Sequence, residues 1–111
     1  MMTETGAVYG CQTWGKDGLI DALEAMKRSI KECRIMFPLR EVCVYDPDLL
    51  YRDYEVRLYI PDLGIYGCLV EINYEMYDIF KDSIVKIADK LTDDSYIQIV
   101  AIIKGRLKTY Y

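Results

Sequence analysis

The sequence predicts an α+β domain in which two helices pack on one face of a mainly antiparallel sheet. Two long stretches carry apolar residues at helical spacing, and five shorter stretches are rich in β-branched or aromatic residues. A tight turn joins two of these shorter stretches, which favours antiparallel pairing. At 111 residues and 52% apolar composition, the chain is expected to form a single domain around one core.

The best-marked element is a β-hairpin from Tyr54 to Ile72. Apolar residues alternate with polar or aromatic residues between Tyr54 and Ile60, which is the period of a strand with one buried face. Pro61 to Gly64 then supplies a turn, because proline presets the backbone and glycine tolerates positive φ. The second strand is expected to extend from Ile65 to Ile72.

The N-terminal part predicts a strand followed by a helix. Residues Ala7 to Trp14 include β-branched and aromatic residues and indicate a strand. Asp17 is placed to cap a helix that extends to about Met36, before Pro38. The helix is indicated by one apolar stripe, formed by Leu19, Leu23, Met26, Ile30, Cys33 and Phe37.

The remaining elements follow from similar patterns. Arg40 to Asp46 is apolar on both faces, which predicts a central strand covered on both sides. Asn73 can cap a second helix that extends to about Leu91, and Tyr96 to Ile103 predicts an interior strand. The tail 104–111 is read either as a short strand or as a frayed end. The order β-α-β-β-β-α-β is that of a ferredoxin-like arrangement with one added strand.

The residue inventory argues against an enzyme. Histidine is absent, which excludes Ser-His and Cys-His catalysis and histidine-ligated metals. No glycine-rich phosphate loop or nucleophile elbow is present, so no cofactor is expected. The four cysteines, which lack the spacing of a zinc site, are interpreted as buried thiols, with a disulfide as the alternative; they are Cys11, Cys33, Cys43 and Cys68.

Two further features predict a cytoplasmic protein that does not enter a membrane. No apolar run approaches the roughly 20 residues that a spanning helix needs. The first ten residues lack the basic and apolar regions of a signal peptide.

Charge is unevenly distributed along the chain. Residues 38–72 hold seven acids and three bases, and the segments on either side are neutral, so this region accounts for the net charge of -4. Such an acidic surface favours a partner protein with a basic surface. The alternative is that aspartate collects in turns for conformational reasons, as at Asp46 and Asp62.

Tyrosine is the second unusual feature of the same region. The chain contains eleven tyrosines, and tyrosine is favoured at protein interfaces because it joins an apolar ring to a polar hydroxyl. We therefore predict an acidic, tyrosine-rich interaction surface around the hairpin. Its residues are Asp48, Tyr51, Asp53, Tyr54, Glu55, Arg57, Tyr59 and Asp62.

These features predict a small non-catalytic binding protein. Its size and charge are those of inhibitors with which viruses and mobile elements occupy the basic surface of a host protein. A homodimer is also expected, because the chain is small and rich in apolar residues and tyrosine, and an unpaired edge strand could join two copies.

Two alternative sites are indicated. The basic C-terminal segment predicts a module that binds single-stranded nucleic acid, through Lys104, Arg106, Lys108 and Tyr110. The acids Asp46, Asp48, Asp53 and Glu55 are possible oxygen ligands for Mg²⁺ or Ca²⁺. Their spacing does not match an EF-hand loop, so no metal site is predicted.

Overall fold

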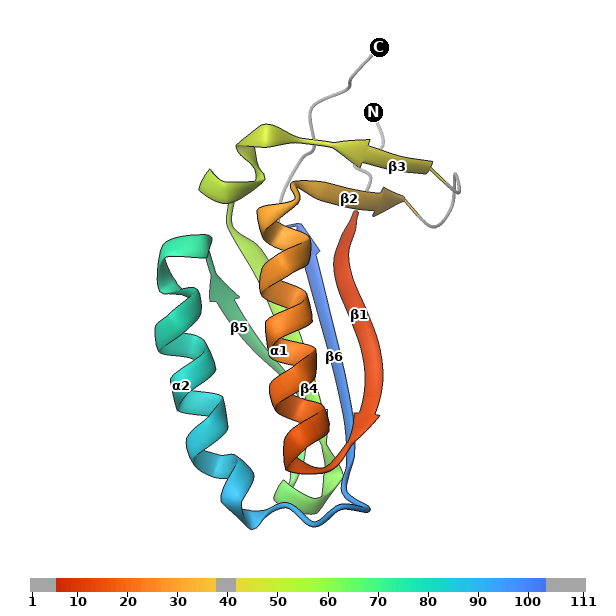
Figure 1. The fold of residues 1–111 in the computed structure, drawn as a ribbon, viewed down its shortest axis with the longest axis vertical. Helices are drawn as coiled ribbons and strands as arrows, with labels where there is room; N and C mark the ends of the chain where they lie inside the picture. Colours follow the sequence, from red (N-terminus) through yellow and green to blue (C-terminus); the bar gives the residue numbers. More distant parts are fainter. Residues whose placement is uncertain (1–5, 38–41, 104–111) are drawn as a thin grey trace.

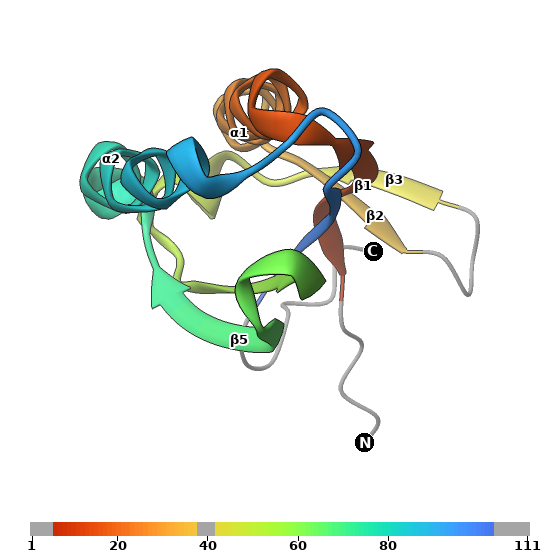
Figure 2. The same cartoon turned by 90° about the horizontal axis from the view of Figure 1, so that it is seen from below.

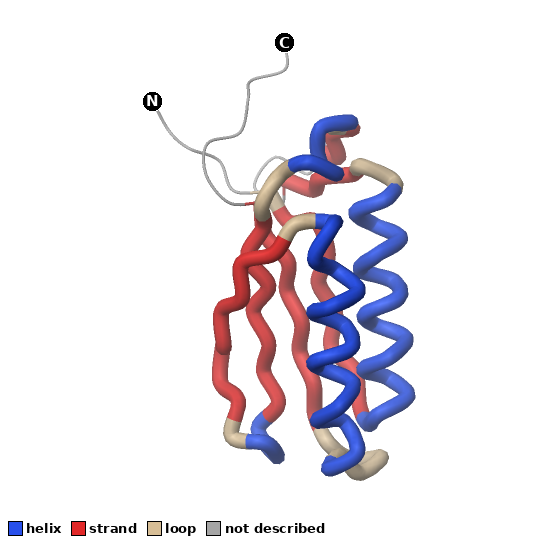
Figure 3. The backbone as a smooth tube through the Cα atoms, turned by 90° about the vertical axis from the view of Figure 1, so that its left-hand side faces the viewer, coloured by secondary structure: helices blue, strands red, loops and turns tan. Residues whose placement is uncertain are grey.

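The computed structural model describes residues 6–37 and 42–103 and shows a sheet layer and a helix layer (Figures 1 and 3). In chain order the elements are β1 (Ala7–Trp14), α1 (Gly15–Lys31), β2 (Arg34–Phe37), β3 (Val42–Tyr45), the 3₁₀ helix η1 (Pro47–Tyr51), β4 (Tyr54–Ile60), the 3₁₀ turn η2 (Pro61–Leu63), β5 (Ile65–Ile72), η3 (Tyr74–Met76), α2 (Tyr77–Ile87), η4 (Ala88–Lys90) and β6 (Tyr96–Ile103). Within these residues the six strands are ordered β3-β2-β1-β6-β4-β5, and every pair is antiparallel.

Both helices lie on the same side of the sheet because of how the strands are connected (Figure 2). The chain from β1 to β4 passes through α1 and then through β2, β3 and η1, and β1 and β4 are parallel with β6 between them. The connection through α2 joins β5 to β6, which are parallel with β4 between them. The two connections start from strands that run in opposite directions, and they cross the sheet in opposite directions. If both are right-handed, as such connections almost always are, both helices lie on the same face. This confirms the predicted α+β class, whereas the strand order does not show the ferredoxin-like arrangement.

The core is centred on β6, which was predicted as an interior strand and is confirmed as one. It pairs with β1 along one edge and with β4 along the other. Its inward side chains, Ile97, Ile99, Ala101 and Ile103, are at most 1% exposed. They pack with the buried stripe of α1, which includes Leu19, Leu23, Met26 and Ile30. Burial of such apolar side chains contributes roughly 1.5–3 kcal/mol each.

The first helix is shorter than predicted. It begins at Gly15, so Asp17 lies in its first turn and does not cap it, and it ends at Lys31. Cys33 then adopts a left-handed conformation with φ of 57°, and Arg34–Phe37 forms strand β2. The residues Cys33 and Phe37 fit both a helical stripe and the alternation of a strand. Pairing of β2 with β3 decides between these two patterns.

The predicted central strand Arg40 to Asp46 is wrong in its position. Strand β3 covers only Val42–Tyr45, and it lies at the end of the sheet, next to β2. Val42 and Tyr45 are 46% and 66% exposed, and Cys43 is also exposed. An apolar run can be a covered strand or an edge strand, and the sequence pattern does not distinguish the two.

The hairpin formed by β4 and β5 is confirmed, with an irregularity that the sequence did not predict. Gly64 ends the turn with φ of 70°, as the turn chemistry requires. Gly67 has φ of 73° and lies where the register between β4 and β5 shifts. The ring of Tyr59 on β4 lies directly against the backbone of Gly67, because a Cβ built there would be 3.1 Å from this ring.

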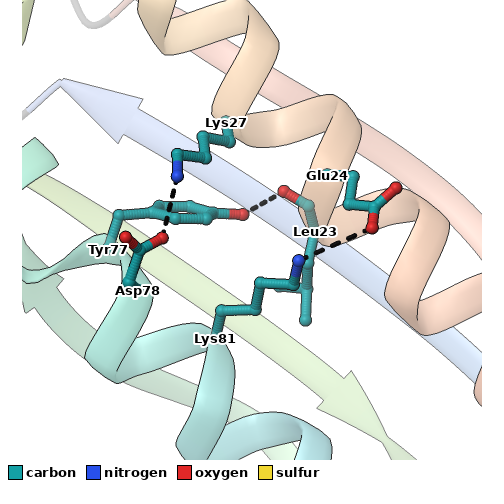
Figure 4. Close-up of polar contacts among 6 residues, drawn as sticks. All are labelled: Leu23, Glu24, Lys27, Tyr77, Asp78 and Lys81. Atoms are coloured by element: carbon teal, nitrogen blue, oxygen red, sulfur yellow. Dashed lines mark hydrogen bonds and ion pairs between the residues drawn. The ribbon is translucent and has the colours of Figure 1, made fainter.

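The second helix is confirmed from Tyr77 to Ile87, with 3₁₀ turns on either side. The Asn73 side chain accepts a hydrogen bond from the backbone N–H of Met76 at 3.1 Å, which is the predicted cap. The buried Tyr77 donates its hydroxyl to the carbonyl of Leu23 on α1. Ion pairs flank this contact, as Figure 4 shows; they join Lys27 to Asp78 and Lys81 to Glu24.

Gly67→Ala is expected to destabilise the fold more than Gly64→Ala. Both glycines have positive φ, so each substitution strains the backbone at a cost of roughly 1 kcal/mol. At Gly64 nothing lies within 4 Å of an added Cβ, whereas at Gly67 the Tyr59 ring must move, at a further cost of about 1 kcal/mol. Urea unfolding measures both values. In a Tyr59→Ala background the difference between the two glycine variants should disappear, and equal costs in the wild-type background would contradict this packing.

The fold is expected to lose stability above about pH 10, where unfolded tyrosine ionises. Burial raises the pKa of Tyr77 and of Tyr54 well above the usual range. Since the folded pKa exceeds the unfolded one, the stabilising effect is complete below pH 10 and declines as the pH rises. Tyr77→Phe removes one titrating group, so its unfolding free energy should fall less steeply between pH 10 and pH 11. Tyr54→Phe should act in the same direction, and slopes identical to wild type would contradict both.

Candidate functional site

The predicted hairpin residues divide between the two faces of β4. Glu55, Arg57 and Tyr59 point away from the helices, because they alternate with the buried residues of this strand. Tyr54 belongs to the buried set and has no exposed surface, so it is not available to a partner. Its hydroxyl has no hydrogen-bond partner among the described residues. Tyr54 is therefore a core residue, and its predicted place on the interaction surface is wrong.

The other predicted residues lie at opposite ends of β4. Asp48 and Tyr51 belong to η1, and Asp53 immediately precedes β4. All three are exposed, Tyr51 by 83%. Asp62 belongs to η2 after β4, and a strand of this length spans about 23 Å. The eight predicted residues therefore do not form one compact surface.

Asp62 has a structural contact at its end of the sheet. Its carboxylate accepts a hydrogen bond from the hydroxyl of the buried Ser95 at 2.6 Å. Ser95 lies just before β6, and its hydroxyl also accepts from the backbone N–H of Thr92. These bonds hold the hairpin turn against the segment that leads into β6.

At the other end, a buried ion pair holds η1 in place. Asp46 is fully buried, and its carboxylate lies 2.8 Å from the Nε of Arg52. The second carboxylate oxygen accepts from the backbone N–H of Asp48 at 2.9 Å. Asp46 is therefore committed to the fold, although it was considered as a metal ligand. Within the described ranges, no group of three or more acidic or cysteine side chains is arranged to hold a metal ion.

The three cysteines whose side chains are described differ in burial. Burial and the nearby carboxylate of Asp46 raise the pKa of the Cys33 thiol, which keeps it protonated and unreactive. Cys11, Cys33 and Cys43 are free thiols. The exposure of Cys43 corrects the expectation that it is buried, and the side chain of Cys68 lies outside the described part of the structure.

The face of the sheet that points away from the helices is the main candidate surface. The strand registers place on it Gly10, Gln12 and Trp14 of β1, Tyr96, Gln98, Val100 and Ile102 of β6, and Glu55, Arg57 and Tyr59 of β4. We call these ten residues the open face. Neither α1 nor α2 covers them, since both helices pack on the other side of the sheet (Figures 2 and 3).

Aromatic rings on the open face are held in fixed positions. Trp14, although 55% exposed, packs edge to face with Tyr96, with 5.9 Å between the ring centroids. Tyr59 packs on Gly67 of the neighbouring strand. Sequence reasoning found Tyr59 but missed Trp14 and Tyr96. The alternation of residues in β1 and β6 could have placed both rings on one face if the pairing of these strands had been known.

The charged residues of the open face lie toward the start of β4, because Glu55 pairs with Ile102 whereas Trp14 pairs with Tyr96 at the other end of β6. Glu55 lies 3.8 Å from Arg57, and Glu71 of β5 lies directly opposite Glu55 on the adjacent strand. Glu55 and the Trp14–Tyr96 pair therefore lie at opposite ends of the open face.

The alternative nucleic-acid residues, Lys104, Arg106, Lys108 and Tyr110, lie outside the described residues. In the part of the chain that is described, no helix is long and apolar enough to cross a membrane.

Comparison with protein-family models, curated proteins and solved structures finds no significant match. Function therefore has to be inferred from the geometry of the chain itself.

Proposed function

We propose that this chain is a non-catalytic protein-binding domain whose open face docks on a basic surface of a partner protein. The observation that carries this proposal is the one-sided helix layer, which leaves Trp14, Tyr96 and Tyr59 on the sheet face that neither described helix covers. Exposed aromatic groups of this kind, next to polar residues, are typical of interaction surfaces.

The aromatic rings are suited to binding because they are already ordered. Trp14 and Tyr96 pack on each other, and Tyr59 packs on Gly67, so little side-chain freedom remains to be lost on association. Tryptophan and tyrosine are also the residues most often found at the energetic centre of interfaces.

The acidic groups support a partner with a basic surface. On the same face, about 20 Å along β6 from the Trp14–Tyr96 pair, the Glu55 carboxylate can pair with a basic side chain of the partner while other partner groups contact the rings. Charge complementarity of this kind also accelerates association. We propose that the partner surface is a nucleic-acid-binding groove, as for small inhibitors of viruses and mobile elements; size and charge support this analogy. Self-association as a homodimer remains a prediction.

Substitutions on the open face are expected to abolish partner binding while equivalent substitutions on α2 do not. Trp14→Gln and Glu55→Lys each change the open face, and we expect at least a tenfold loss of affinity for a captured and purified partner. Ile79→Gln and Asp82→Lys are matched controls, because both residues are exposed on α2. Calorimetry with the purified partner measures the affinities. Equal losses for the two sets, or no loss for the open-face variants, would disprove the proposal.

A second candidate, a module that binds single-stranded nucleic acid, is favoured by one observation. Aromatic rings on a sheet face can stack nucleobases, and this face carries the exposed Trp14 and the half-buried Tyr96 and Tyr59. The net charge of -4 opposes phosphate binding, so this candidate ranks second.

Mobility-shift assays with single-stranded RNA and DNA at two salt concentrations separate the two candidates. The protein-binding proposal predicts no shift. The second candidate predicts binding that weakens steeply with salt and is lost when Lys104, Arg106 and Lys108 are changed to alanine. That pattern would reverse the ranking of the two functions.

A further inference from the structure

One edge of β1 has hydrogen-bonding capacity that the sheet does not use. β1 pairs with β6 along its length on one side. On the other side, the described residues include a single pairing with β2, at Ala7 and Met36. Among the described residues, the backbone of residues 8–14 therefore has no strand partner on this side, and such an edge is a template for an added strand.

A groove of about 330 Å³ runs along this edge, between β1 and α1. Tyr9, Cys11 and Thr13 line it from the strand. From the helix it is lined by small residues at helical spacing, Gly18, Ala22 and Ala25. Helix and strand approach most closely at one end, where a Cβ on Gly18 would clash with the hydroxyl of Thr13. An unpaired strand edge beside a helix is the geometry in which extended peptides bind by strand addition.

The two ends of the groove differ in charge. Arg28 and Asp21 both line the groove and both are exposed. Arg28 lies two helical turns beyond Asp21, toward the end of α1 that leads to β2 and the start of β1, where Tyr9 also lines the groove. Asp21 is one helical turn from Gly18 and therefore lies toward the Thr13 end. The groove is thus positive where β1 begins and negative where β1 ends.

The pairing of β2 at Ala7 limits what can occupy this edge. Because β2 takes the next position along the same edge, an added strand must end or turn away at the Tyr9 end of the groove. A strand that ends in a free C-terminus can occupy the edge without reaching β2. Its terminal carboxylate would lie beside the guanidinium of Arg28, and a guanidinium binds a carboxylate through strong, charge-assisted hydrogen bonds. A strand that ends there is antiparallel to β1, and its N-terminal side lies toward Asp21.

We propose that the groove between β1 and α1 binds the C-terminal segment of a partner protein as an added antiparallel strand, with the terminal carboxylate on Arg28 and a basic side chain near Asp21. The free edge of β1 accommodates a segment of about seven residues. This surface differs from the open face, since it combines the strand edge with the helix side of the sheet, although Gln12 lines the groove and also belongs to the open face.

The test uses an array of heptapeptides of varied sequence, each made with a free C-terminal carboxylate and with a C-terminal amide. The full-length chain is expected to bind a subset of the free-carboxylate peptides, at least tenfold more tightly than their amides. Arg28→Gln should remove this difference, whereas Lys90→Gln, which changes an exposed base on η4, should not. Fluorescence polarisation with the best binder gives the affinities.

A second set of variants locates the binding site. Ala25→Phe fills the groove from an existing helix position and should abolish peptide binding, with helix content and thermal midpoint confirming the fold. Glu55→Lys changes the open face and should leave peptide binding intact, so failure of this proposal is distinguishable from failure of the proposed function. In NMR titrations, the amide shifts should concentrate at Tyr9, Gly10, Cys11, Gln12 and Thr13.

Several outcomes would overturn the proposal. These are an array without binders, binding that tolerates amidation, and binding that survives Ala25→Phe. Light scattering that shows a dimer of the 13.0 kDa wild-type chain, converted to a monomer by Ala25→Phe, would assign the groove to a second copy of this chain instead.

Discussion

The pairing of β6 with β1 on one side and with β4 on the other is the interaction on which the rest of the structure depends. β1, β2 and β3 form one part of the sheet, and β4 and β5 form the other. Within the described residues, β6 is the strand that joins them. Its inward residues complete the core under α1, and its outward residues form the centre of the open face. Both the fold and the proposed interaction surface therefore depend on one strand.

The apolar and aromatic content of the chain serves two purposes. On the helix side of the sheet, it forms a continuous core in which even Tyr54 and Tyr77 are fully buried. On the other side, Trp14, Tyr96 and Tyr59 remain uncovered but are held by their neighbours. Because aromatic rings exposed on a single-layered sheet face cost solubility, their ordered placement supports an interaction role for this face. The proposed binding at the groove beside β1 depends instead on backbone groups of β1 that lack a strand partner among the described residues. These groups lie between the opposite charges of Asp21 and Arg28.

Much of the fold could be predicted from sequence because local patterns agree with it. The hairpin, the cap at Asn73 and the interior strand β6 all follow from alternation, turn chemistry or β-branched residues. The residues around Cys33 could not be assigned, since their spacing fits both a helix and a strand and only pairing with β3 decides. The candidate site was predicted less well. Grouping residues by their closeness in sequence placed Asp48 with Asp62, although the whole of β4 separates them. It also could not reveal that Trp14 of β1 contacts Tyr96 of the neighbouring strand β6.

The position of β6 in the chain also has a consequence for how the protein is made. β6 is the last of the described strands to leave the ribosome, yet both parts of the sheet require it. Until it emerges, the facing edges of β1 and β4 are both open, and the contacts between β1 and β6 span most of the chain. Long-range pairing of this kind is slow, and open edges invite incorrect association. Assembly of the sheet is therefore a late event in synthesis, and the nascent chain is most vulnerable to aggregation just before residues 96–103 are available.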